Sequence, residues 1–185
     1  FQRQRQQILD LPTHNAVMPV YDVDLHKEKP YIAMKFVEGA SLRERFRKER
    51  ELLIETVCKL AEHLAQGLDN LHEAGQVHGD INLGNVLLDP AGKAVLTDFH
   101  ITAVAELTQS VLEQTEPLGY MPYLAPEQWE GEPLVPQTDV YQFGVLLYEL
   151  LAGQRPFAET TMDKLREAIV HGSPPKITAK KPELP

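Results

Sequence analysis

The sequence predicts an α+β fold that is mainly helical, with a small amount of β-sheet toward its N-terminal end. Apolar residues recur at helical spacing from Leu53 to Leu71 and again over about Thr138–Leu151. Two pairs of short strand-like runs supply the sheet. With 185 residues, 43% of them hydrophobic and 24% charged, the chain suits one globular domain with a single core.

The N-terminal elements expected are a helix and a hairpin. Residues 1–11 indicate the end of a helix, because Pro12 stops it. The strand-like runs Ala16–Val23 and Pro30–Val37 come next, and the charged turn Asp24–Lys29 between them predicts that they pair as a hairpin.

The helix predicted over residues 53–71 keeps one apolar stripe on a single face. Cys58 falls among these positions, so we expect it to pack in the core. As the only cysteine, it excludes a disulfide within the chain and fits a reducing compartment. The stripe consists of Leu53, Val57, Leu60, Leu64, Leu68 and Leu71.

Beyond that helix, the runs Asn85–Asp89 and Ala94–Asp98 predict two short strands around a turn. Residues 103–119 are polar with weak periodicity, which predicts a long functional loop. A second buried helix is expected over about Thr138–Leu151, and the Pro- and Lys-rich end at 173–185 should pack little. The apolar positions of this second helix are Val140, Phe143, Leu146, Leu147 and Leu150.

The charge balance and the hydropathy pattern bear on whether the chain binds nucleic acid or crosses a membrane. The net charge of −9 argues against a nucleic-acid partner, because phosphate neutralisation needs a basic face. No stretch approaches the ~18 consecutive apolar residues of a membrane span, and the polar start does not resemble a signal peptide. We therefore expect a cytoplasmic domain that has no membrane segment and binds no nucleic acid.

One group of polar residues has a spacing that suits phosphoryl transfer. The run His78-Gly79-Asp80 is followed by Asn85 and, after the second predicted hairpin, by Asp98. Phosphoryl transfer needs a group that orients the attacking hydroxyl and oxygen ligands that hold Mg²⁺ on the phosphates of ATP. Asp80 can serve the first purpose, and Asn85 and Asp98 supply oxygen ligands at the two ends of one hairpin.

These residues resemble the catalytic loop H-R-D-x-K-x-x-N and the metal-binding D-F-G of protein kinases. Residues 31–39 are similar to the strand and hinge that hold adenine, 123–128 (Y-L-A-P-E-Q) to the end of the activation segment, and 139–144 (D-V-Y-Q-F-G) to the start of the central large-lobe helix. The resemblance implies a protein-kinase-like fold. A partial small lobe, with the end of helix C and two strands, would occupy 1–36, and a large lobe, incomplete at its C-terminus, 37–185.

The resemblance also implies a role for each matching residue. Asp80 would be the catalytic base, Asn82 and Asn85 would complete the catalytic loop, and Asn85 and Asp98 would ligate the metal. His78 and Phe99 would stack, and Asp139 would anchor the loop backbone. Besides Asp98, the nucleotide-binding residues would be Met34 as gatekeeper, Lys35 and Val37 through their backbones, and Leu87 under the base.

Four positions depart from the kinase pattern. Gly79 stands in place of Arg, Asn82 in place of Lys, His100 in place of Gly and Tyr120 in place of Thr. The same H-G-D-x-x-x-x-N run is similar to that of aminoglycoside and choline phosphotransferases, which work with Gly at this position and without the Lys. The catalytic loop can therefore function in this form.

The resemblance implies a bacterial-style Ser/Thr protein kinase that transfers the γ-phosphoryl group of Mg-ATP to a protein hydroxyl. The alternatives are a pseudokinase scaffold that docks a partner and, with less support, a small-molecule phosphotransferase. The predicted loop contains three candidate phosphorylation sites, Thr108, Ser110 and Thr115. His72, like the other remaining histidines, has no metal-ligand spacing and is predicted to be an ordinary surface or core residue.

Overall fold

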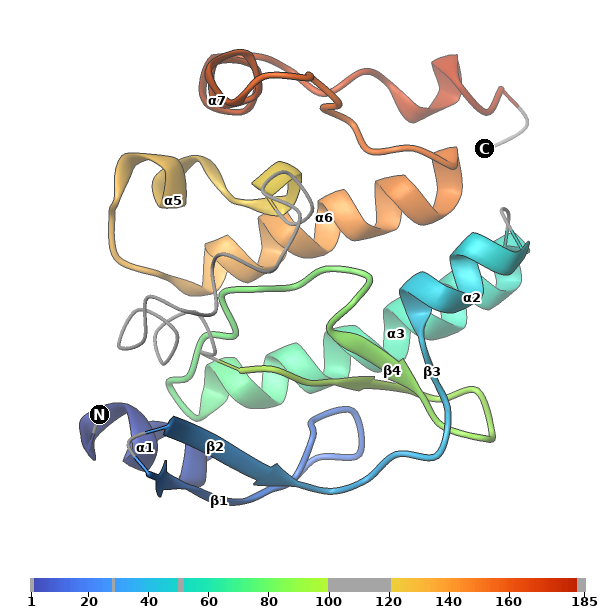
Figure 1. Ribbon diagram of the computed structural model, residues 1–185. Coiled ribbons are helices and arrows are strands. Elements are labelled where there is room, and N and C mark those ends of the chain that lie inside the picture. The colour runs from blue at the N-terminus through green and yellow to red at the C-terminus, as the bar shows by residue number, and fades with distance from the viewer. Residues whose placement is uncertain (1, 28, 50–51, 100–120, 183–185) are drawn as a thin grey trace.

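The computed structural model describes residues 2–27, 29–49, 52–99 and 121–182 and has the predicted α+β class (Figure 1). Two long helices, α3 (Ile54–Glu73) and α6 (Pro136–Ala152), pack against each other in the middle of the molecule. A hairpin with helix α1 (Gln2–Leu9) lies at one end, and helix α7 (Met162–His171) lies at the other.

The hairpin consists of β1 (Val20–His26) and β2 (Lys29–Met34), which pair antiparallel with Val23 opposite Ile32. The strand predicted from Ala16 begins only at Val20. The backbone of Met18 donates to Leu96 O at 2.8 Å, and that of Leu96 donates to Ala16 O at 2.8 Å. Residues 16–18 therefore pair with a strand of the second sheet, while the hairpin starts after Pro19.

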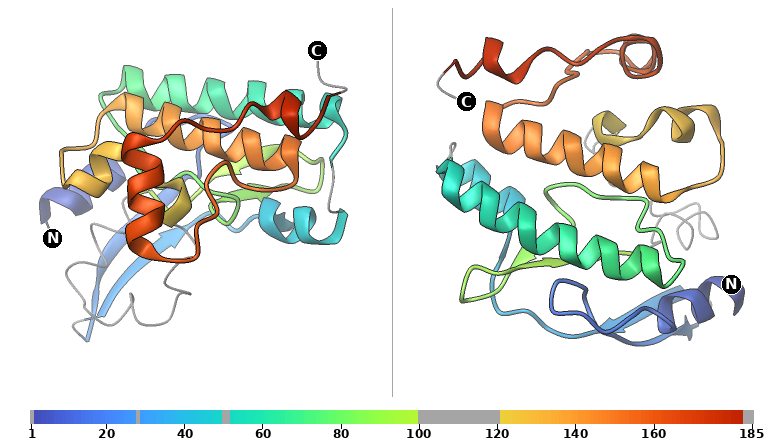
Figure 2. Two further views of the ribbon diagram at one scale, coloured as in Figure 1. Left: turned by 90° about the horizontal axis from the view of Figure 1, so that it is seen from above. Right: turned by 180° about the vertical axis from the view of Figure 1, so that it is seen from behind.

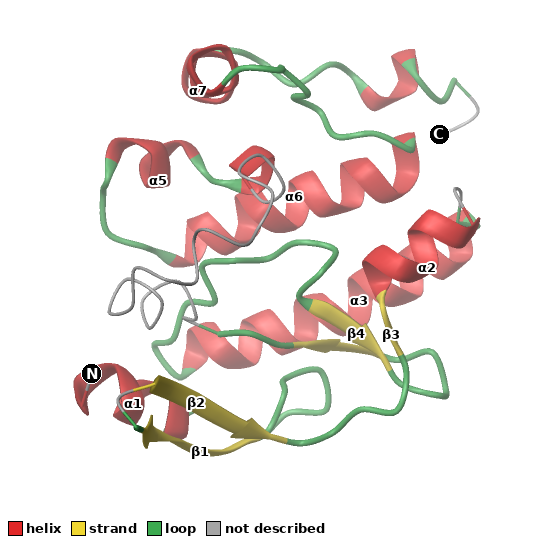
Figure 3. Ribbon diagram, in the orientation of Figure 1, coloured by secondary structure: helices red, strands yellow, loops and turns green. Residues whose placement is uncertain are grey.

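The second sheet joins three short strands and carries helix α2 (Figure 3). Strand β4 (Val86–Leu88) lies between β3 (Ala40–Ser41) and β5 (Ala94–Leu96), and both pairings are antiparallel. Helix α2 (Leu42–Glu49) follows β3 directly. The pairing of β3 with β4 therefore fixes where α2 begins relative to the hairpin that precedes Asp98.

Helix α3 buries the predicted stripe from Val57 to Leu71, but two expectations about it are wrong. Leu53 is 75% exposed, because it precedes the first helical residue and lies outside the packed face. Cys58 is exposed rather than buried, since it follows Val57 directly and successive helical residues point about 100° apart.

Helix α6 spans the predicted second helix and extends it at the N-terminal end to Pro136. Val140 is 62% exposed, so it does not belong to the buried face that Leu146 and Leu150 share. Helix α7 packs against the short helix α5 (Pro126–Glu130), as Figure 2 also shows. The remaining short elements are the 3₁₀ turns η1 (Met121–Tyr123) and η2 (Ile177–Ala179).

The predicted loop at 103–119 lies outside the described residues, as do Thr108, Ser110 and Thr115. Within the described ranges, none of the helices combines the length and the apolar character needed to cross a bilayer.

Candidate active site

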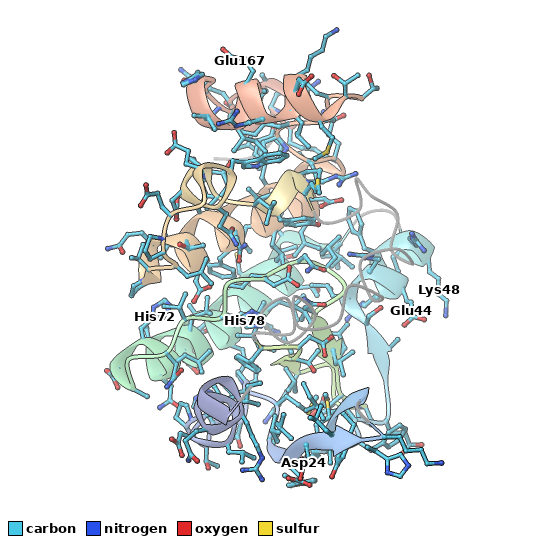
Figure 4. All side chains as sticks on the ribbon, turned by 60° about the vertical axis from the view of Figure 1, so that its left-hand side comes forward. Asp24, Glu44, Lys48, His72, His78 and Glu167 are labelled. Atoms are coloured by element: carbon cyan, nitrogen blue, oxygen red, sulfur yellow. The ribbon has the colours of Figure 1, made fainter. Side chains whose placement is uncertain are left out.

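The loop that contains His78 and Asp80 has no regular secondary structure and is held by helix α6. The Asp139 carboxylate is fully buried and accepts the backbone N–H groups of His78 at 2.8 Å and Gly79 at 2.7 Å. His72 at the end of α3 contacts the same carboxylate through Nε2 at 2.7 Å. Figure 4 shows His72 and His78 on the two segments that meet there. Asp139 thereby joins α3, α6 and this loop.

Two glutamine side chains also bind this loop, Gln142 from α6 and Gln128 from α5. The Nε2 groups of Gln142 and Gln128 both donate to Gly79 O at 3.0 Å, and Gln142 Oε1 accepts the Ile81 N–H at 2.8 Å. Gly79 has a φ of 78°, a left-handed backbone that glycine adopts without steric cost. A Cβ at this position would lie 2.6 Å from Leu134 Cδ1. The loop is therefore shaped for glycine at the place where the kinase pattern has Arg.

The structure brings Asp80, Asn82 and Asn85 together in one hydrogen-bonded group. The side-chain amide of Asn82 donates to Asp80 Oδ1 at 3.0 Å, and that of Asn85 donates to Asp80 Oδ2 at 2.9 Å. Asn85 also donates to Asp80 O at 2.9 Å. Both carboxylate oxygens of Asp80 are thus held in place, and its side chain has a defined orientation.

Asp98 lies beside this group because the β4–β5 hairpin returns the chain to it. The Thr97 N–H donates to Asn85 O at 3.0 Å, one residue before Asp98. Burial raises the pKa of both carboxyls, and the negative charge of Asp98 adds to the rise at Asp80. The hydrogen bonds from Asn82 and Asn85 act in the opposite direction on the pKa of Asp80. Asp98 is thus close enough for its charge to act on Asp80.

The donor set fits a magnesium ion that arrives with a nucleotide. Asn85 uses its amide nitrogen toward Asp80, which leaves Oδ1 as the atom that could ligate a cation, and Asp98 offers a half-buried carboxylate. Among the described residues, no cluster of three or more His, Cys, Asp or Glu forms a complete metal site. Mg²⁺ is commonly held by one or two protein oxygen groups together with substrate phosphates, so two donors are sufficient in that setting.

Of the residues predicted to bind adenine, Met34 ends strand β2, Lys35 and Val37 follow it, and Leu87 lies in strand β4. Met34, Val37 and Leu87 are partly buried against the main core. Lys35 donates its N–H to Pro19 O at 2.9 Å, so its carbonyl is the backbone atom that could accept from a base. Met34 also lines a cavity of about 10 Å³ with Asp98 and Phe99, which has room for about one water molecule.

His78 and Phe99 are both buried and contact each other as the kinase resemblance implies. Their ring centroids lie 4.4 Å apart at an interplanar angle of 45°. The His78 ring also contacts Thr97 O through Nε2 at 3.1 Å. This contact ties the loop that carries Asp80 to the segment that carries Asp98.

Sequence reasoning missed four side chains that shape this site. The sequence predicts His72 to be an ordinary surface or core residue, and its motifs assign no role to Gln128, Gln142 or Arg43. Gln142 lies four residues before Leu146, so the sequence places it on the buried face of the second helix. Because buried amides need hydrogen-bond partners, this position was a signal that Gln142 binds another segment. Arg43 belongs to a run of charged residues and gives no such signal. His100 and Tyr120 lie outside the described residues.

Comparison with known proteins identifies the family of this chain. A model of the family described as protein tyrosine and serine/threonine kinase matches residues 1–183. The chain is 36% identical over 163 residues to a probable serine/threonine-protein kinase of Streptomyces coelicolor, covering 85% of this chain and 24% of the relative. It is 31% identical to the probable kinase PknB of Lactococcus lactis, covering 100% of this chain and 29% of that protein, and 31% identical to PknB of Mycobacterium tuberculosis, covering 85% and 26%. It thus spans under a third of the length of these relatives. The chain belongs to the protein tyrosine and serine/threonine kinase family.

Proposed function

We propose that this chain is part of a Ser/Thr protein kinase that transfers the γ-phosphoryl group of ATP to a protein hydroxyl. The observation that carries the proposal is the group formed by Asp80, Asn85 and Asp98. The Asp80 carboxylate is oriented by Asn85, and the charge of Asp98 acts on it, which supports the arrangement that metal-assisted phosphoryl transfer needs.

In this proposal Asp80 accepts a hydrogen bond from the substrate hydroxyl and orients it toward the γ-phosphate. Its fixed carboxylate oxygens support this role, because positioning contributes most of the catalysis in this reaction. Asn85 and Asp98 would hold Mg²⁺, which neutralises charge on the phosphates when it is bound. Met34, Lys35, Val37 and Leu87 would hold the adenine.

The Ser/Thr assignment rests on the relatives and on the Y-L-A-P-E-Q segment. The matched relatives are named serine/threonine kinases. Tyr123 of this segment is buried and its hydroxyl donates to the Glu149 carboxylate on α6, which fixes the segment against the long helix. We also propose the lobe boundary near residue 36 and a reducing, cytoplasmic setting, the latter supported by the lone cysteine.

One observation favours a second candidate, a pseudokinase scaffold. Asn82 is neutral and its amide is turned to Asp80, so position 82 itself offers no positive charge to a transferring phosphate. A scaffold would keep the fold and a docking surface without transferring phosphate.

Single-turnover transfer of labelled γ-phosphate by the full-length protein separates the two candidates. Asp80→Asn and Asp98→Asn keep the shape of each side chain and remove its charge, so each should lower the transfer rate by at least about 100-fold. Asp69→Asn is the matched control, because Asp69 is exposed on α3, and it should leave the rate unchanged. Equal rates for the wild type and both site variants would reject the kinase and leave the scaffold.

A further inference from the structure

Arg43 connects helix α2 to the catalytic loop at the level of Asn82. Its backbone N–H donates to Leu83 O at 2.9 Å, and its Nη2 donates to Asn82 Oδ1 at 3.0 Å. The residue is half-buried and stands in the first turn of α2. The same arginine thus binds both the main chain and a side chain of the loop.

Asn82 passes this contact on to Asp80. Asn82 is buried, with 3% of the residue exposed. The oxygen and the nitrogen of its side-chain amide bind different partners. Oδ1 accepts from Arg43 and from the Gly84 N–H at 2.8 Å, while Nδ2 donates to Asp80 Oδ1 at 3.0 Å. Because the amide is planar, fixing Oδ1 also fixes the direction in which Nδ2 points. Arg43 and the Gly84 N–H thus hold the amide that binds one of the two carboxylate oxygens of Asp80.

Gly84 leaves the space that this chain of contacts needs. A Cβ on Gly84 would lie 3.0 Å from Arg43 Nη2 and 3.0 Å from Asn82 Oδ1. Any larger residue at position 84 would press between the guanidinium and the amide. The glycine, the asparagine and the arginine therefore form one packed arrangement.

The start of α2 is also held firmly enough to place Arg43. Ser41 pairs with Leu87 in the sheet. Its backbone N–H donates to Glu44 Oε2 at 2.9 Å, and the Glu44 N–H donates to Ser41 Oγ at 3.2 Å. This reciprocal capping fixes the first turn of the helix. Arg43 thus projects from a defined backbone.

We propose that Arg43 is a positioning residue for Asp80, which acts through Asn82 and brings to the catalytic loop the positive charge that position 82 lacks. This inference rests on the proposed kinase function. It assigns to α2 a part in the reaction that the motif residues alone do not indicate.

Steady-state kinetics of the full-length protein test the role of Arg43. Arg43→Met keeps the length of the side chain and removes its charge and its hydrogen bond. It should lower kcat by roughly 10- to 100-fold, the range for loss of a hydrogen bond to a charged group, and change the KM for ATP less than about twofold. Arg43→Lys should recover most of kcat. Arg47→Met is the control, because Arg47 is exposed in the last turn of the same helix, and it should match the wild type.

Two further variants keep the proposal open to refutation if Arg43→Met is unstable. Gly84→Ala should lower kcat by a smaller factor than Arg43→Met, because its methyl group would lie 3.0 Å from both Arg43 Nη2 and Asn82 Oδ1 and lengthens their contact while both residues remain. The double variant Arg43→Met/Asn82→Lys should recover kcat relative to Arg43→Met, because the charge is restored next to Asp80. An unchanged kcat in Gly84→Ala, or no recovery in the double variant, would overturn the proposal.

A measurement that does not depend on activity follows the contact itself. The NMR signals of the Asn82 side-chain amide and the Gly84 amide should shift in Arg43→Met and stay in place in Arg47→Met. A wild type no faster than Asp80→Asn rejects the proposed kinase function. If the wild type is active and Arg43→Met is equally active, the role of Arg43 is rejected while the kinase function stands. Amide signals that do not shift in Arg43→Met lead to the same conclusion.

Discussion

The Asp139 carboxylate accepts the backbone N–H of Gly79 at 2.7 Å across a sequence separation of 60 residues. The same carboxylate binds His78 and His72, so it serves three donors from two other segments. Asp139→Ala should therefore lower the free energy of unfolding by roughly 2–5 kcal/mol, because buried donors are left unpaired. Urea denaturation measures this loss. Asp69→Ala on the exposed face of α3 should cost less than about 0.5 kcal/mol, and a similar small cost for Asp139→Ala would contradict the anchoring role.

Gln142 is fully buried and binds the loop through both ends of its amide. Gln142→Met keeps the volume but leaves the Ile81 N–H unpaired, so we expect a loss of about 1–3 kcal/mol in the free energy of unfolding. Hydrogen exchange at the Ile81 amide should become faster in the variant. Gln154→Met, at an exposed position just beyond α6, is the control and should change neither quantity. Unaltered exchange at Ile81 in Gln142→Met would argue against this contact.

Two helical glycines should respond to the same substitution with opposite signs. Alanine in place of glycine in a helix normally stabilises by about 0.5–1 kcal/mol. Gly144 on α6 has nothing within 4 Å of an added Cβ, so Gly144→Ala should raise the melting temperature. Gly67 on α3 packs against Ala16, whose Cβ would lie 2.9 Å from the new methyl group, so Gly67→Ala should lower it. Equal shifts in the two variants would show that α3 does not pack closely on residue 16.

The capping pair of Ser41 and Glu44 predicts a pH-dependent contribution to stability. The hydrogen bond from the Ser41 backbone is the largest cause that lowers the pKa of Glu44. Because the pKa is lower in the folded state than the unfolded value of about 4.3, the stabilisation is present above that pH and is lost as the pH falls through the folded-state pKa. Glu44→Gln should thus be less stable than the wild type at pH 7, and the difference should shrink toward pH 3. Glu62→Gln, exposed on α3, is the control, and a difference that stays constant with pH would refute the expectation.

The strongly periodic parts of the fold could be predicted from the sequence, and the weakly periodic parts could not. The stripe from Val57 to Leu71 is long enough to specify α3. The predictions that Leu53 belongs to this stripe and that Cys58 packs in the core are wrong, because both residues are exposed. Helix α2 has only Leu42 and Phe46 as apolar residues among charged ones, so its pattern resembles a solvated segment.

The residues of the candidate site could be selected from motif spacing, but their connections could not. Spacing singled out Asp80, Asn85 and Asp98, and the hairpin between them made their proximity a reasonable expectation. The contacts from Gln142 and Arg43 come from helices far away in sequence or weak in pattern. Such contacts depend on packing angles that one sequence does not reveal.

Asp139 and Gln142 reach the loop at 78–81 through main-chain atoms only. Every residue type except proline presents those same atoms, so these bonds from helix α6 do not depend on which side chains the loop carries. A replacement of the Asp80 side chain therefore leaves these bonds in place, whereas position 79 still needs glycine because of its φ of 78° and the nearby Leu134 side chain. The backbone path of the loop and the chemistry of its side chains are in this way specified by different residues.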